Sequence, residues 1–305
     1  MLSILTSTFN SSRHIEFFLN NIKKQADKLN VSYEIIIVDD GSKDNTLEIL
    51  KEIIPVIKNL KIIELSNNFG QIAAIFCGLK LCSGKEIFIT DSDIEENEDN
   101  LIRFYEEFKK DNSLDMVYGV VSKKEGYGFL NNLSSQIFNK LIYSLTNNEI
   151  PKNQSWTRII SHKLSMELLK FKEIESYPAG VFSLVGFKQK KLDINKKFKG
   201  YSSYNLSKKI KLALNICTNF SSLPLVAICV FGLIVSLISF LFVLIIFFAK
   251  IFIGFSSGWA SLIIFIGFIG GVNILSIGIV GIYISKIFTQ VKNRPAYIIK
   301  DKINF

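Results

Sequence analysis

Histidine and cysteine, the residues most often used as catalytic bases and soft-metal ligands, are scarce in this chain. Its 305 residues include two histidines and four cysteines. The histidines, His14 and His162, are interpreted as surface or helix-end residues rather than as catalytic bases. The cysteines lack metal-ligand spacing and are interpreted as free thiols in a reducing compartment. They are Cys77, Cys82, Cys217 and Cys229.

Charge is absent from two long segments near the C-terminal end. Residues 212–249 and 251–285 contain no Asp, Glu, Lys or Arg, while the whole chain is 49% hydrophobic with a mean hydropathy of +0.30. Each segment exceeds the roughly 20 apolar residues that cross a bilayer. The sequence therefore predicts two transmembrane helices, at about 223–249 and 259–285, and two buried core helices are the alternative.

The first residues lack the basic start and long apolar core of a signal peptide, so residues 1–205 are expected in the cytoplasm. Basic residues lie before the first predicted span and after the second, whereas the loop between the spans has only Lys250. By the positive-inside rule, both ends are cytoplasmic, including a tail over 290–305. The basic residues are Lys208, Lys209, Lys211, Lys286, Lys292, Arg294, Lys300 and Lys302.

A formal net charge of +9 is explained in part by these residues beside the predicted spans. This arrangement suits anionic lipid headgroups, and the chain has no motif that indicates nucleic-acid binding. Residues 206–222 place apolar side chains on one helical stripe with lysines opposite. This pattern is typical of an interfacial helix lying on a membrane, and a helix packed on the domain is an equal alternative.

About the first 110 residues alternate between strand and helix patterns. In the first helical pattern, Ile15, Phe18, Leu19 and Ile22 share one face. Such alternation predicts an α/β fold with a mostly parallel, doubly wound sheet. Strands are predicted at 2–9, 33–42 (a run that ends in acids and a Gly turn), 61–65, 85–90 and 115–119, and helices at 11–29, 44–54, 70–84 (closed by Gly84) and 100–111.

Two acidic clusters follow predicted strands, Asp39 with Asp40 and Asp91 with Asp93. In a parallel sheet, ligands bind at the carboxyl ends of the strands, so both clusters are expected at that edge. Carboxylates two residues apart can turn toward one metal ion, and hard oxygen ligands select Mg²⁺ or Mn²⁺. The pattern therefore predicts a site that binds a divalent ion and phosphate oxygens.

Four segments resemble, in order and spacing, the family 2 glycosyltransferases with a GT-A fold. The segments after them are similar to polyprenyl-phosphate glycosyltransferases of the bacterial GtrB and dolichyl-phosphate-mannose-synthase type. The first set comprises TSTFN, IIIVDDGSKDNT, LSNNFGQIAAIFCGL and ITDSDIEENED. The second comprises FSSLPL, GW and GIYISKIFTQVKNRPAYII, together with the two predicted spans.

The resemblance implies a role for each matching residue. Asp91 and Asp93 would hold the metal, Mg²⁺ or Mn²⁺, and Glu95 would lie beside the metal. Asp93 and Glu95 are both counted among the catalytic residues. Arg158 would face the acceptor phosphate or the diphosphate, and it is counted among the catalytic residues. Lys197 and Lys199 would lie in a loop that closes over the site, toward the acceptor phosphate. The nucleotide-sugar would be bound by Thr8, Asn10, Asp39, Asp40, Asn68, Gln71 and Asp91.

The chain also departs from the family pattern. Ser7 stands where proline is usual, and Ser11 stands where a glutamate near the base is usual. Ser203 replaces a lysine of the dolichol-type relatives. These departures leave open which nucleotide the donor carries.

The implied activity is inverting transfer of one sugar from a nucleotide-sugar, a UDP-sugar by expectation, to undecaprenyl phosphate. A lipid phosphate is already anionic and needs no general base, which agrees with the shortage of histidine. The resemblance places the enzyme in the bacterial cytoplasmic membrane as a multi-pass protein that forms a homotetramer and modifies cell-envelope glycans.

Two other functions remain open. A processive family 2 polysaccharide synthase would carry a Q-x-x-R-W motif and more spans, whereas residues 154–158 read QSWTR. A catalytically silent membrane scaffold would not need Asp40, Asp91, Asp93 and Arg158.

Overall fold

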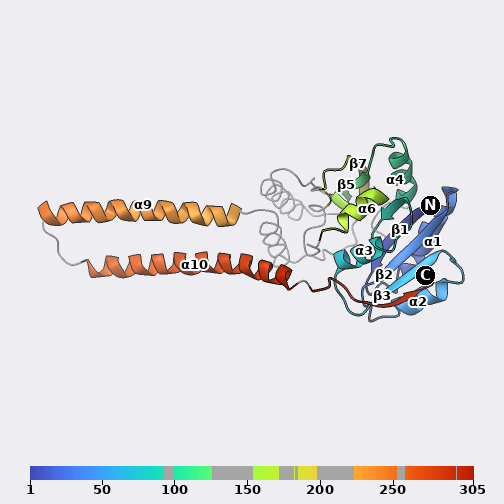
Figure 1. Ribbon diagram of the computed structural model, residues 1–305, viewed down its shortest axis with the longest axis horizontal. Coiled ribbons are helices and arrows are strands. Elements are labelled where there is room, and N and C mark those ends of the chain that lie inside the picture. The colour runs from blue at the N-terminus through green and yellow to red at the C-terminus, as the bar shows by residue number, and fades with distance from the viewer. Residues whose placement is uncertain are drawn as a thin grey trace. The chain divides into compact units, whose positions relative to one another are not determined.

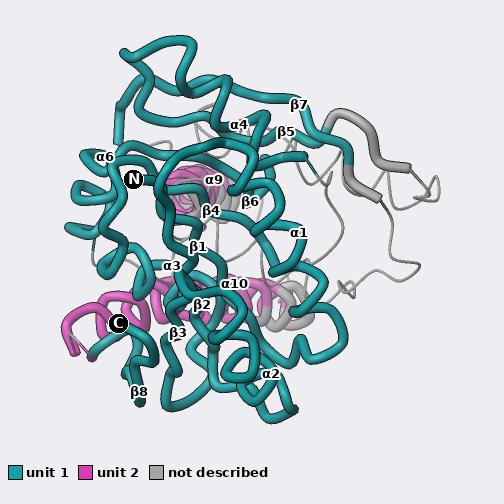
Figure 2. Tube along the Cα trace, turned by 90° about the vertical axis from the view of Figure 1, so that its right-hand side faces the viewer, with its two compact units in different colours: residues 1–212, 295–305 teal, residues 213–294 magenta. Residues whose placement is uncertain are grey.

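The computed structural model describes residues 1–92, 99–125, 154–171, 182, 185–197, 223–252, 258–292 and 294–305. The chain divides into two compact units, coloured separately in Figure 2. The first unit joins Met1–Leu212 with Pro295–Phe305, and the second comprises Ala213–Arg294. Residues far apart in sequence therefore belong to one unit.

The first unit is built on one eight-stranded sheet with the strand order β7-β5-β6-β4-β1-β2-β3-β8. Neighbouring strands are parallel except where β6 pairs with β4 and β5, and where β8 pairs with β3. The predicted α/β class with a mostly parallel sheet is confirmed. The strands are β1 (Leu2–Thr8), β2 (Tyr33–Asp39), β3 (Leu60–Leu65), β4 (Glu86–Ile89), β5 (Met116–Glu125), β6 (Gln154–Ser161), β7 (Gln189–Lys197) and β8 (Ile299–Ile303).

Helices cover both faces of this sheet (Figure 1). On one face, α1 (Ile15–Lys28), α2 (Thr46–Ile53) and α4 (Asn100–Lys109) pack with the strands in one apolar cluster. On the other, α3 (Gln71–Leu79) and α6 (His162–Leu168) form a second cluster. Because side chains alternate between the faces of a strand, both faces need apolar residues, which explains the continuous apolar runs of the central strands.

The parallel strands bring the predicted site residues to one edge. Thr8 ends β1 and pairs with Asp39, the last residue of β2. Asp91 lies two residues beyond the end of β4, which neighbours β1 on the other side. The carboxyl end of β2 therefore carries Asp39 with Asp40, and Asp91 follows the carboxyl end of β4, whereas Asp93 lies outside the described residues.

The C-terminal residues form an element that the sequence analysis did not predict. Within the expected tail 290–305, Ile299–Ile303 forms β8 and pairs antiparallel with β3. The ladder joins Ile62 with Ile303 and Ile63 with Lys302. The end of the chain is thus an edge strand of the first unit rather than a separate tail.

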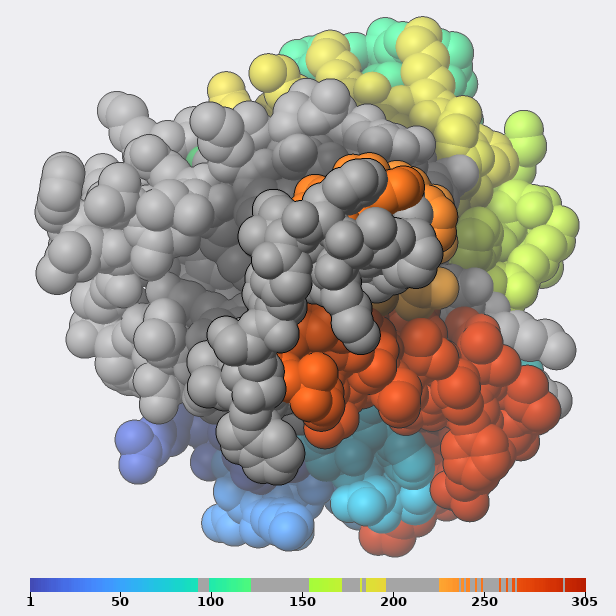
Figure 3. Space-filling view, turned by 90° about the vertical axis from the view of Figure 1, so that its left-hand side faces the viewer, coloured from blue at the N-terminus to red at the C-terminus, as the bar shows by residue number. Residues whose placement is uncertain are grey.

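The second unit contains the helices α9 (Leu223–Phe252) and α10 (Trp259–Val291). Among the described residues, one candidate membrane span is found by length and apolarity, Phe268–Val291, and α9 includes a shorter apolar run, Leu225–Val235. Figure 3 shows part of the α10 surface in red. Several large apolar side chains of α10, such as Ile274, are exposed. Two membrane spans remain a prediction, and the predicted helix 206–222 lies outside the described residues.

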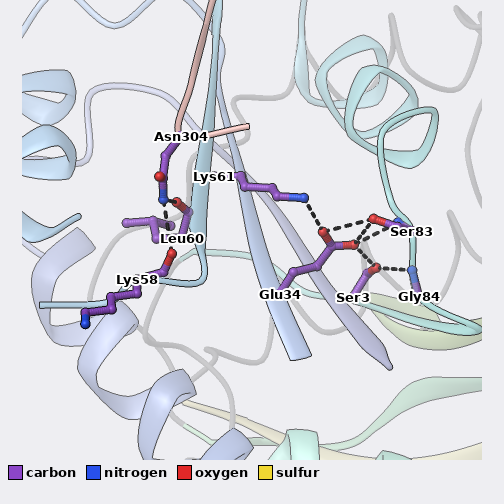
Figure 4. Close-up of polar contacts among 8 residues, drawn as sticks. All are labelled: Ser3, Glu34, Lys58, Leu60, Lys61, Ser83, Gly84 and Asn304. Atoms are coloured by element: carbon purple, nitrogen blue, oxygen red, sulfur yellow. Dashed lines mark hydrogen bonds and ion pairs between the residues drawn. The ribbon is translucent and has the colours of Figure 1, made fainter. Parts of the chain in front are cut away.

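A buried carboxylate joins the amino ends of the strands, opposite the acidic edge. Glu34 is 4% exposed and accepts hydrogen bonds from Ser3 Oγ at 2.5 Å, Ser83 N at 2.7 Å and Lys61 Nζ at 2.8 Å (Figure 4). Ser3 Oγ in turn accepts from Gly84 N at 2.8 Å. Burial raises the pKa of Glu34, but the donors outweigh burial and hold the pKa below its usual value.

Glu34→Gln is expected to lower the free energy of unfolding by about 2 kcal/mol at pH 7, since it removes charge-assisted hydrogen bonds from a buried site. Because the folded-state pKa is lowered, the stabilisation is present above the unfolded pKa and is lost as pH falls through the folded one. Chemical unfolding in detergent, followed by Trp156 fluorescence in a Trp259→Phe background, measures the difference at several pH values.

Glu52→Gln is the matched control, because Glu52 is exposed on α2. Its effect is expected to be small at every pH. An effect of Glu34→Gln that stays constant down to pH 3 would contradict the assignment.

Candidate active site

The carboxylate of Asp39 stabilises the turn that follows β2. Asp39 is 1% exposed, and it accepts hydrogen bonds from Ser42 N at 3.1 Å and from Ser42 Oγ. Burial raises the pKa of Asp39, while the Ser42 donors oppose the rise. The nearby carboxylates of Glu64 and Asp40 raise it further. Asp39 therefore fixes the turn that follows the strand.

Asp40 connects this turn to the loop that follows β3. Its carboxylate accepts hydrogen bonds from Phe69 N at 2.7 Å and Gly70 N at 2.9 Å, and its own N–H donates to Thr8 O at 2.9 Å. Burial raises the pKa of Asp40, and the two backbone donors limit that rise. Asp40 thus joins the turn after β2 to the loop after β3 through its side chain, and to the end of β1 through its backbone.

Gly41 allows these two segments to approach closely. Its φ is +68°, a left-handed conformation that favours glycine. A Cβ atom at this position would lie 2.6 Å from Asn67 C and 2.9 Å from Asn68 N. The glycine is therefore required both by its own backbone conformation and by the neighbouring loop.

The segment after β1 is hydrogen-bonded to the same turn. Asn10 has a φ of +50°, its N–H donates to Ser42 Oγ at 2.9 Å, and its Oδ1 accepts from Lys43 N at 2.8 Å. Thr8 is 3% exposed, and its Oγ1 has no hydrogen-bond partner among the described residues. The carboxyl ends of β1 and β2 thus form one hydrogen-bonded unit.

Gln71 and Asp91 meet across the edge. Gln71 is the first residue of α3, and its Nε2 donates to Asp91 Oδ1 at 2.6 Å. Both side chains are at least partly exposed, so a ligand can reach them. Asn68, three residues before Gln71, is also exposed. These contacts bring together the predicted nucleotide-sugar residues of β1, β2, α3 and β4.

Arg158 is a buried cation on the neighbouring strand β6, where it pairs with Ile89 at the end of β4. It is 1% exposed, and its guanidinium donates to Trp156 O at 3.0 Å and to Ser155 O at 2.8 Å. The guanidinium carbon lies 4.0 Å from the centre of the Phe182 ring, a cation–π distance. The strand's own carbonyls and an aromatic face therefore fix this charge.

The remaining predicted residues are only partly covered by the structure. Asp93, Glu95 and Lys199 lie outside the described residues. Lys197 is the last residue of β7, and its backbone pairs with Glu125 at the end of β5. Their proposed roles, and the metal site that includes Asp93, stay predictions. In the described part of the chain, no group of three or more His, Cys, Asp or Glu residues could hold a metal ion.

The sequence matches a family model described as "Glycosyl transferase family 2" over residues 3–169. This range is more than half of the chain and contains Asp39, Asp40, Asp91 and Arg158. The chain belongs to glycosyl transferase family 2. It is therefore a glycosyltransferase, as the motifs predict.

Relatives cover nearly the whole chain. An "Uncharacterized glycosyltransferase YkcC" of Bacillus subtilis is 31% identical over 98% of this chain and 93% of its own length. The "SfII prophage-derived bactoprenol glucosyl transferase" of Shigella flexneri is 30% identical over 98% of this chain and 97% of its own. The similarity thus extends through the α9 and α10 region as well as the sheet.

The fold of the first unit recurs in solved structures. A structure described as "Crystal Structure of a Mycobacterial Protein" superposes with a TM-score of 0.51 at 15% identity, and the match covers 72% of each chain. Identity this low supports the fold alone. The GT-A assignment of the glycosyltransferase unit is thereby confirmed.

Several residues of the site were not predicted from the sequence. Ser42 orients Asp39, and Phe182 packs against Arg158. The small Gly41-Ser42 pair after two aspartates is a local signal for an aspartate-capped turn. Phe182 had no such signal, because its contact with β6 joins residues that are distant in sequence.

Gly41→Ala is expected to weaken donor binding strongly and to destabilise the first unit. It would add a left-handed strain of about 1–2 kcal/mol and a clash with Asn67 that costs roughly 1–3 kcal/mol more. Gly186→Ala is the matched control, because Gly186 also has a φ of +68° but no atom lies within 4 Å of its Cβ position. Thermal unfolding and nucleotide titration compare the two variants. Equal losses in both would show that contact with the loop is unimportant.

Proposed function

We propose that this protein transfers a single sugar from a nucleotide-sugar to a polyprenyl phosphate at the cytoplasmic leaflet of a bacterial membrane. The observation that carries the proposal is the similarity to bactoprenol glucosyl transferases over 98% of the chain. A match restricted to the catalytic sheet would suit any family 2 enzyme. This match also includes the candidate span Phe268–Val291. A span suits an enzyme whose acceptor is a lipid phosphate, because the acceptor's chain lies in the bilayer.

The donor binds at the edge formed by β1, β2 and α3 in this proposal. Asp39 and Asp40 organise the backbone around the base and ribose, and the exposed side chains of Asn68 and Gln71 reach the sugar diphosphate. Thr8 and Asn10 complete the floor of the site. A UDP-sugar is the proposed donor, and separate assays with UDP- and GDP-sugars measure the nucleotide preference.

The residues present suit a hard divalent ion. Asp91 offers a carboxylate at the carboxyl end of β4, and Asp93 supplies a second carboxylate in sequence, with Glu95 nearby. An all-oxygen set of this kind favours Mg²⁺ or Mn²⁺ over softer metals. When bound there, the ion supplies positive charge that stabilises the departing diphosphate. Gln71 orients the Asp91 carboxylate through its amide hydrogen bond.

The acceptor phosphate attacks the anomeric carbon as the bond to the diphosphate breaks, which inverts that centre. The phosphate oxygen is already anionic, so no protein group has to remove a proton. Arg158 contributes a fixed positive charge on the strand beside β4, and Lys197 and Lys199 attract the acceptor phosphate. Catalysis then depends on positioning and on charge control rather than on a histidine base.

The proposal includes a membrane-anchored, multi-pass enzyme. Helices α9 and α10 would be two spans, preceded by an interfacial helix at 206–222, and homotetramers would form through this region. The chain passes from the end of α10 into β8 through residues 292–298. Since β8 is antiparallel to β3, it begins at the sheet edge where β2 ends in Asp39.

Membranes containing the protein are expected to convert a labelled nucleotide-sugar and undecaprenyl phosphate into a lipid that carries one sugar and releases it in mild acid. UDP- and GDP-sugars are tested separately, and products are resolved by chromatography and mass spectrometry. A long polymer would support a processive synthase instead. Absence of both turnover and nucleotide binding with every donor would overturn the proposal.

Asp93→Ala and Asp91→Ala are each expected to abolish this transfer, because each removes an anionic oxygen ligand from the diphosphate site. Chelation with EDTA should do the same, and added Mn²⁺ or Mg²⁺ should restore activity. Asp27→Ala is the control, since Asp27 is exposed on α1 and its ion pair with Lys23 contributes little. Unchanged turnover in Asp93→Ala protein that remains folded would contradict the metal assignment.

A further inference from the structure

The C-terminal segment, residues 297–304, contacts the loop that carries part of the candidate donor site. Its strand β8 pairs Asp301 with Glu64 and Ile299 with Leu65, with an irregularity between the two pairs. The ladder then continues past the end of β3, because Ser66 N donates to Ile298 O at 2.9 Å. The hydrogen-bonded contact therefore reaches the first residue of the loop 66–70.

The same loop is held at its other end by Asp40. Phe69 N and Gly70 N donate to the Asp40 carboxylate, and Asn67 packs over Gly41. The loop is thus fixed at Ser66 by the C-terminal segment and at residues 69–70 by the turn after β2. Gln71, which binds Asp91, follows directly in the chain.

Apolar packing joins the C-terminal segment to the same place. Tyr297 and Ile299 are partly buried against the cluster to which Phe69 and Ile72 also belong. Burial raises the pKa of Tyr297, with a smaller contribution from Cys77 of α3. The segment therefore contributes side chains as well as a backbone carbonyl to the surroundings of the loop.

The far end of the segment is anchored independently of the loop. Asn304 has a φ of +64°, and its side-chain amide donates to Leu60 O at 2.6 Å and to Lys58 O at 3.1 Å (Figure 4). An ion pair between Lys300 and Glu64 lies on the exposed side and contributes little. Asn304 is therefore the main polar anchor of the strand end.

We propose that residues 297–304 position the donor-site loop, so that donor affinity depends on a segment that follows α10 in the chain. This inference rests on the donor site proposed above. Without the Ser66 contact, the loop would sample more conformations, and ordering it on binding would cost affinity. Ile298 and Asn304 are positioning residues, since they act through the loop rather than on the reactants.

Ser66→Pro tests the contact directly, because proline has no N–H to donate to Ile298 O. The preceding residue, Leu65, is in a strand, a conformation that a following proline accepts. Ser66→Ala is the matched control, since it keeps the N–H. Nucleotide-sugar titration of the full chain in lipid nanodiscs should show donor Kd raised about tenfold by proline, as expected for loss of one hydrogen bond, and unchanged by alanine.

Asn304→Gly provides a second test that leaves the loop sequence intact. Glycine keeps the positive φ and removes the amide that binds Lys58 and Leu60. Donor Kd should rise while the KM for undecaprenyl phosphate stays constant. A general loss of structure would instead change both constants, which would overturn the inference, as would an unchanged donor Kd in both variants.

The outcomes separate this inference from the proposed function. If the unmodified chain binds no nucleotide-sugar, the proposed function fails before any variant is compared. If it binds and transfers, but neither Ser66→Pro nor Asn304→Gly raises the donor Kd, only the positioning role fails. Should Ser66→Pro not fold, Asn304→Gly decides the question alone.

Discussion

The hydrogen bonds from the backbone of Phe69 and Gly70 to the buried carboxylate of Asp40 are the interaction on which the site depends. An aspartate buried this deeply is costly unless donors surround it, and here both oxygens accept from the main chain. The same residue also donates its N–H to Thr8 O. Three strand ends are thereby fixed relative to one another before any ligand arrives, which is the preorganisation that binding requires.

At this edge of the sheet, the buried polar residues and the exposed polar residues have different roles. Asp39 and Asp40 are buried, and their carboxylates accept hydrogen bonds from backbone N–H groups, so they shape the site. Gln71 and Asp91 are more exposed and available to a ligand. Arg158 is buried, and its guanidinium is hydrogen-bonded to carbonyls of its own strand. Charges of both signs are thus held near the end of β4, as a reaction that moves negative charge between two phosphates demands.

Local sequence patterns predicted most of the helices and strands of the first unit, but they did not predict strand pairing between residues that are distant in sequence. The spacing of Ile15, Phe18 and Leu19 indicated a helix with one buried face, and all three are buried in α1. Gly84 was expected to close the third helix, but α3 ends at Leu79. A Cβ at Gly84 would lie 2.5 Å from Ser3 N, so this glycine serves a close approach instead. The strand β8 gave no signal because its partner is over 200 residues away.

The first unit is discontinuous in sequence, since its last strand follows the helices α9 and α10. A ribosome therefore finishes seven strands long before it makes the eighth, and the edge of β3 stays unpaired while the apolar helices are synthesised. An unpaired edge strand is a template for association with other chains. Completion of this sheet is thus coupled to the emergence of Ile299–Ile303, and a nascent chain stalled within α10 would leave the edge of β3 open.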